Sequence, residues 1–139
     1  MVRLYSPPEP KPWLLPPRTW EGTLPEFAVY WGHTALGLKE GIDFLYQSPV
    51  SGGRLNRGGT IIDFEELDVP VGIRVQGLYW HAYAGQDKIA SDAMLKLQAE
   101  STGMTIIDID EDDALRSPKY FVEEARGFRD HSRAGRGII

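Results

Sequence analysis

Asp63 is the residue whose type and surroundings first suggest chemistry. It interrupts the apolar run at residues 61–64, which otherwise has the composition of a buried β-strand. A buried carboxylate is costly unless it is paired, hydrogen-bonded or bound to a metal ion. Glu26 and His81 are the residues that we expect to join it. Two acids and a histidine suit metal-assisted hydrolysis, in which carboxylates hold a divalent cation and the histidine takes the proton of attacking water.

Each of these candidates also has a structural interpretation. Asp63 could cap a turn or form an ion pair with Arg74. His81 follows a tryptophan and could be a hydrogen-bonded histidine of the core, and Glu26 could act only as a helix cap. Gln76 joins the candidate set because it belongs to the predicted strand that leads to His81. Since side chains alternate along a strand, Gln76 and Arg74 share one face.

A capping box predicts the helix that carries Glu26. Thr23 and Glu26 have the spacing in which each side chain caps the other residue's backbone. Pro25 suits the first turn of a helix. The helix is therefore expected to run to about Leu36 and to stop at Gly37, a residue type that commonly ends helices.

The remaining elements follow from apolar periodicity and from glycine and proline boundaries. We expect strands at residues 42–50, 60–66, 70–77 and 104–109, and helices at about 86–102 and from Pro118 onward, with Ser117 as a cap. The glycine-rich segment 52–59 is expected to be a loop or a hairpin turn. The apolar face of the helix at 86–102 should comprise Ile89, Ala93, Met94 and Leu97. This order predicts an α/β domain with a mixed sheet of about four strands flanked by helices, its third and fourth strands parallel.

Two distinctive segments flank the predicted domain at residues 21–128. Residues 1–20 contain six of the ten prolines and are expected to form an extended arm. Trp13 and Trp20 in this arm are candidates for contacts with the domain or with another protein. Residues 129–139 form a tail rich in arginine and glycine.

The composition limits the function classes. A chain of 139 residues without cysteine can form a core but no disulfide and no thiolate zinc site. The formal net charge of −5 is not typical of a protein that coats nucleic acid. No apolar run is long enough to span a membrane, so the cytoplasm is the expected compartment. Basic residues could still contact phosphate locally, or could belong to a solvated mixture of charges; the candidates are Arg54, Arg57, Arg74 and Lys88.

Taken in order, these motifs resemble the PD-(D/E)xK nuclease superfamily and, within it, the very-short-patch repair (Vsr-like) endonucleases. The resemblance spans about residues 23–115. Its five features are Thr23-x-x-Glu26, Phe44-x-x-Gln47, Asp63-Phe64, Gly77-Leu78-Tyr79-Trp80-His81, and a closing half with Lys88, Asp92, Gly103 and the strand at 104–109.

The resemblance implies a restriction-endonuclease-like fold and an endonuclease that hydrolyses DNA with Mg²⁺ or Mn²⁺. Asp63 would be a metal ligand, Glu26 an auxiliary acid near the metal and His81 the general base. The chain departs from the superfamily pattern at residues 74–76, where Arg-Val-Gln stands in place of Glu-x-Lys. Gln76 takes the position of a histidine in the repair endonucleases.

That departure from the superfamily pattern leaves open an alternative function that is not enzymatic. The protein could keep a nuclease fold without the chemistry and serve as a structural or assembly subunit. Its arm and tail would then bind neighbouring subunits of a bacteriophage particle, assembled in a bacterial cytoplasm, or of another DNA-handling complex.

Overall fold

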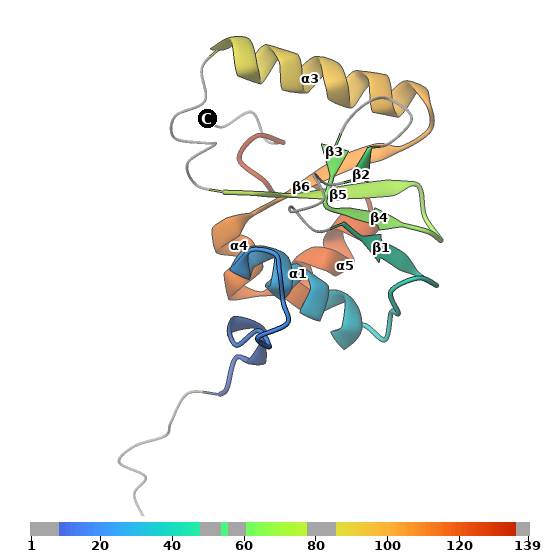
Figure 1. Cartoon of the computed structure of the whole chain (residues 1–139). Helices are drawn as coiled ribbons and strands as arrows, with labels where there is room; N and C mark the ends of the chain where they lie inside the picture. The colour runs from blue at the N-terminus through green and yellow to red at the C-terminus, as the bar shows by residue number, and fades with distance from the viewer. Residues whose placement is uncertain (1–8, 48–53, 56–60, 78–85, 136–139) are drawn as a thin grey trace, which may run out of the picture.

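Four strands form the central sheet, in the order β1 (Phe44–Tyr46), β4 (Phe64–Glu66), β5 (Val71–Gln76) and β6 (Thr105–Asp110). The structure is a computed structural model that describes residues 9–47, 54–55, 61–77 and 86–135 (Figure 1). The first two strand pairs are antiparallel, whereas β5 and β6 are parallel. The α/β class, the four-stranded mixed sheet and the parallel pair are therefore confirmed.

Helices cover both faces of the sheet (Figure 1). On one face lie α1 (Leu24–Ala35), α4 (Glu111–Arg116) and α5 (Pro118–Arg126), packed over the main apolar core. On the other face lies α3 (Gln86–Ser101), the crossover between β5 and β6. Among the described side chains of α3, Ala99 is the one that joins Ile62 and Ile106 in the second buried cluster.

The capping box at the start of α1 is confirmed. The Thr23 N–H donates to Glu26 Oε1 at 2.9 Å, and the Glu26 N–H donates to Thr23 Oγ1 at 3.3 Å. The helix ends as expected, since Leu36 is its C-cap and Gly37 has a positive φ of 82°. Gly32 permits close packing on α5, because a Cβ at that position would lie 2.8 Å from the Pro118 carbonyl oxygen.

Several predicted boundaries were wrong. The strand expected at 60–66 is divided by a bend at Asp63 into β3 (Ile61–Ile62) and β4, and β3 pairs with β2 (Arg54–Leu55) inside the expected loop. The strand expected at 42–50 is shorter, because only β1 pairs and residues 48–50 lie outside the described part. Helix α4 was not predicted, and the described Ser117 side chain makes no capping hydrogen bond.

The predicted apolar face of α3 was also wrong. Met94 and Leu97 are 57% and 61% exposed, and Ala93 is exposed as well. Ile89 lies within the helix, but its side chain is outside the described set. Asp92 and Lys96 face the sheet instead, because the sheet surface beneath α3 carries charged side chains that need partners.

The described parts of the arm and tail contact the domain. The arm contains one turn of 3₁₀ helix, η1 (Pro12–Leu14), where an extended chain was expected. In the tail, Asp130 accepts a hydrogen bond from the Asp108 N–H at 3.2 Å, and Ser132 is buried. The tail therefore lies along β6, an edge strand of the sheet. Among the described residues, no helix has the length and apolar character needed to cross a membrane.

Candidate functional site

Glu26 and Asp63 come together from separate elements. Glu26 is only 5% exposed in the first turn of α1, where its capping bonds fix the side chain. Asp63 lies at the bend between β3 and β4 and is partly buried. The two carboxyl groups are close enough for Glu26 to raise the pKa of Asp63. The structure thus unites two of the acids that the sequence singled out.

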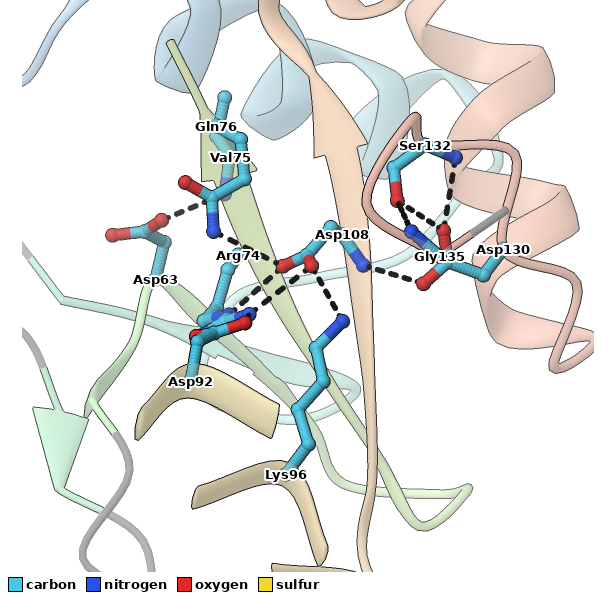
Figure 2. A network of polar contacts seen from close by, with 10 residues as sticks. All are labelled: Asp63, Arg74, Val75, Gln76, Asp92, Lys96, Asp108, Asp130, Ser132 and Gly135. Atoms are coloured by element: carbon cyan, nitrogen blue, oxygen red, sulfur yellow. Dashed lines mark hydrogen bonds and ion pairs between the residues drawn. The ribbon is translucent and has the colours of Figure 1, made fainter. Parts of the chain in front are cut away.

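The bend at Asp63 is held by both its backbone and its side chain. The Asp63 N–H donates to the Ile73 carbonyl at 3.0 Å, and the Asp63 carbonyl accepts from the Gln47 N–H at 3.1 Å. The Val75 N–H donates to Asp63 Oδ2 at 2.8 Å (Figure 2). These bonds orient the carboxylate from the neighbouring strands.

The electrostatic environment of Asp63 favours its protonated form. Burial is the largest effect and raises the pKa of Asp63, and the Glu26 carboxylate raises it further. The hydrogen bond from Val75 and the charge of Arg74 lower it in part, and the result is a pKa of about 7. At neutral pH the Asp63 carboxyl group is therefore only partly ionised, and a bound cation would favour its ionised form.

Tyr46 adds a hydroxyl group to this site. Burial, Glu26 and Asp63 together raise the pKa of Tyr46, so its phenol stays protonated at neutral pH. Among the described residues, its Oη atom is buried without a hydrogen-bond partner. A Cβ at Gly22 would clash with this oxygen and would lie 3.1 Å from Glu26 Oε1. Gly22 therefore allows the Tyr46 hydroxyl to pack close to the Glu26 carboxylate.

Carboxylates and a hydroxyl are ligands suited to a hard divalent cation such as Mg²⁺. The residues that would hold it are Asp63 and Glu26, and the unpartnered Tyr46 oxygen fits a ligand at this place.

A second acidic cluster comprises Asp110, Asp112 and Asp113, whose ligand atoms lie within 4.8 Å of one another. Its charge is already compensated, because Arg133 donates to both Asp110 and Asp112. The Glu26–Asp63 pair is the better candidate for a cation.

Arg74 and Gln76 take part in a separate polar network beside Asp63 (Figure 2). Arg74 Nε donates to Asp108 Oδ1 at 2.8 Å, and its guanidinium also contacts Asp92. Lys96 Nζ donates to Asp108 Oδ2 at 2.6 Å, and Gln76 Nε2 to Asp108 Oδ1 at 3.3 Å. Although burial opposes ionisation, Arg74 and Lys96 hold the pKa of Asp108 below its usual range. The negative charges of Asp92 and Asp108 are thus compensated by the positive charges of Arg74 and Lys96 between α3 and the sheet.

The other predicted site residues are distributed differently. Trp20 stacks on Tyr46 with ring centroids 4.9 Å apart and therefore borders the acid pair. Trp13 donates its indole N–H to the Leu115 carbonyl at 2.7 Å, away from that pair. His81 and Arg57 lie outside the described residues. Arg54 and Lys88 belong to β2 and α3, but their side chains are not among those described.

Tyr46, Lys96 and Asp108 were missed from the sequence. Asp108 carries the same signal as Asp63, since it is an acid inside the apolar strand at 104–109. Lys96 lies four residues after Asp92, so both reach the sheet from one side of α3. The role of Tyr46 has no local signal, because it depends on the packing of α1 against β1.

Comparison with known proteins identifies no relative. No protein-family model matches the chain, and no curated protein or solved structure matches it significantly.

Proposed function

We propose that the protein is a metal-dependent DNA endonuclease of the PD-(D/E)xK type, with its cation held by Asp63 and Glu26. The observation that carries the proposal is the convergence of these two carboxyl groups, with the pKa of Asp63 raised to about 7. An acid with a perturbed pKa in a partly buried site is typical of catalytic centres. Along the chain, the central sheet and its helices follow the order helix, three antiparallel strands, helix and parallel strand. The motifs of the family resemblance occur in the same order, which supports a restriction-endonuclease-like core.

Each residue of the site has a definite task in this proposal. A divalent cation, when bound, supplies Lewis-acid stabilisation of charge on a phosphodiester and lowers the pKa of a bound water. Asp63 is oriented for that role by the Val75 amide, and Glu26 by Thr23. The Tyr46 phenol stays protonated and is a potential hydrogen-bond donor beside the two carboxyl groups. His81 remains the predicted general base.

A second candidate function is a silent nuclease fold in a phage particle or another DNA-handling complex. The observation that favours it is the engagement of Arg74 and Gln76, which occupy the usual Glu-x-Lys positions and are bound to Asp108. That network leaves neither residue free to act on a water. In this alternative the arm and tail would bind neighbouring subunits.

A cleavage assay with matched variants tests the proposal. The full chain is incubated with single-stranded, duplex and branched DNA in Mg²⁺, in Mn²⁺ and in EDTA. Asp63→Asn and Glu26→Gln keep the hydrogen-bond acceptors but remove the charges, while Asp112→Asn alters the other acidic cluster. Metal-dependent cutting that is lost in the first two variants and kept in the third supports the endonuclease. No cutting and no metal binding by the folded protein would favour the silent subunit.

A further inference from the structure

A pocket of about 490 Å³ lies between η1, α1 and the junction of α4 with α5. Its lining includes three aromatic side chains, those of Trp13, Trp31 and Tyr120, and two basic ones, those of Arg116 and Lys119. We call it the Trp31 pocket. A volume of this size is within the usual range for small-ligand sites.

The aromatic walls of the Trp31 pocket are held in place. The Trp13 indole N–H donates to the Leu115 carbonyl at 2.7 Å, which fastens the arm to the end of α4. Trp13 contacts Trp31 with ring centroids 4.9 Å apart and planes inclined at 47°. Tyr120 remains 51% exposed beside them. The pocket therefore offers partly exposed aromatic faces that need little ordering before they bind a flat ligand.

The charge of the Trp31 pocket favours an anion. Arg116 and Lys119 contribute two positive charges, whereas Glu123 is the acid that lines it. The Arg116 side chain is 66% exposed although it contacts Asp113 at 2.8 Å. The first turn of α5 opens here with no acidic residue and no side-chain cap from Ser117. Because Glu123 and Asp113 offset part of the charge of the two bases, the partial positive charge of the helix N-terminus is what shifts the balance of this rim toward an anion.

We infer that the Trp31 pocket binds a nucleotide of single-stranded nucleic acid. A base would stack on the exposed aromatic faces, and its phosphate would lie at Arg116, Lys119 and the start of α5. Aromatic platforms beside a basic rim are the usual means of holding unpaired strands without reading their sequence. The identity of the strand as DNA rests on the proposed endonuclease function, but binding at the pocket does not require cleavage.

Fluorescence titration of the full chain tests this inference. The tryptophan emission is followed as a short oligothymidylate is added in EDTA, which prevents metal-dependent cleavage. Lys119→Glu should weaken binding at least fivefold and make it less sensitive to salt, because one phosphate contact is lost. Trp31→Ala should weaken it about tenfold through lost stacking. Lys39→Glu, an exposed lysine elsewhere, is the matched control and should bind as the parent protein does.

Two results would overturn the inference. One is equal affinity of the Lys119→Glu variant and the parent protein for the oligonucleotide. The other is quenching of the tryptophan emission by a proline-rich peptide but not by the oligonucleotide, which would assign the Trp31 pocket to a polyproline ligand. Asp63→Asn separates this inference from the proposed activity. If the Asp63→Asn variant binds the oligonucleotide but does not cut DNA, binding at the pocket is independent of catalysis. If the parent protein cuts DNA but does not bind the oligonucleotide at the pocket, the inference about the pocket is rejected and the proposed endonuclease function stands.

Discussion

Asp63 Oδ2 accepts the backbone N–H of Val75 at 2.8 Å. In an antiparallel pair this N–H normally donates to a carbonyl of the adjacent strand, so the carboxylate takes the place of a backbone acceptor. The bend that interrupts the predicted strand and the orientation of the candidate metal ligand thus have one cause. An asparagine can make the same bond without charge, which allows the charge of Asp63 to be tested separately from its structural role.

Asp63→Asn should stabilise the protein at high pH. The pKa of Asp63 is about 3.8 in the unfolded chain and about 7 in the folded one. Because the folded pKa is raised, the stability contributed by the protonated group is fully present below about pH 4 and is lost as the pH rises through 7. Removing the charge should therefore add about 1–4 kcal/mol to the free energy of unfolding at pH 8 and almost nothing at pH 4.

Urea denaturation of both proteins at pH 4, 6 and 8 measures this difference directly. Asp43→Asn is the control, since Asp43 also accepts a backbone N–H, that of Lys39 at 2.8 Å. It should produce no gain that grows with pH. If Asp63→Asn is less stable than the parent protein at pH 8, the ionised Asp63 carboxylate stabilises the folded state and the prediction is wrong.

Glu26→Gln should lower the pKa of Asp63, because burial remains but the neighbouring negative charge is removed. Glutamine keeps an oxygen for the Thr23 N–H, so the helix cap should survive. The carboxyl carbon shift of Asp63, followed by NMR against pH, gives the midpoint. Glu40→Gln, which changes an acid bonded to Tyr30, serves as the comparison and should leave the midpoint near pH 7. An unchanged midpoint in Glu26→Gln would mean that the two acids are not coupled.

Metal affinity should rise with pH across the titration of Asp63. A cation competes with the proton for this carboxylate, so Mn²⁺ should bind more tightly at pH 8 than at pH 6 and should release a proton on binding. Calorimetry in buffers of different ionisation enthalpy measures both effects. They should disappear in Asp63→Asn and persist in Asp112→Asn. The reverse pattern would place the cation at the cluster of Asp110, Asp112 and Asp113.

Local patterns predicted the elements of the fold but not every contact. The capping box of α1 and the β-branched runs of β5 and β6 depend on neighbours in sequence, so they could be identified without tertiary information. Helix α4 was missed because its first turn, residues 111–113, consists of acids and shows no apolar periodicity. The convergence of Glu26, Asp63 and Tyr46 depends on how α1 crosses the sheet, which no local pattern encodes.

Asp108→Asn should destabilise the fold by about 3–5 kcal/mol, since it leaves Arg74 and Lys96 buried without their shared partner. Asp113→Asn removes a contact with Arg116, whose side chain is 66% exposed, and should change stability by about 1 kcal/mol or less. Thermal and chemical denaturation of the two variants at pH 7 provide the comparison. Equal effects would indicate that the network under α3 is screened by water and contributes little.

The outer face of α3 gives the last prediction. Apolar periodicity identified the stripe of Ala93, Met94 and Leu97 but could not show whether this stripe faces the sheet or the outside of the molecule. Since Leu97 is 61% exposed and Ala99 is buried against Ile106, Leu97→Glu should change the unfolding free energy by about 0.5 kcal/mol or less. Ala99→Glu should cost several times more, because it places a carboxylate in an apolar cluster.

Urea denaturation of these two α3 variants, with light scattering to determine the mass in solution, checks the orientation of the helix. A large loss of stability in Leu97→Glu without a change in mass would mean that the stripe packs on the sheet and that the ion pairs of Asp92 and Lys96 do not orient the helix. A loss accompanied by dissociation into smaller species would mean that a second copy covers the stripe. Unchanged stability and mass agree with a helix held to the sheet by Arg74 and Asp108 on its inner side.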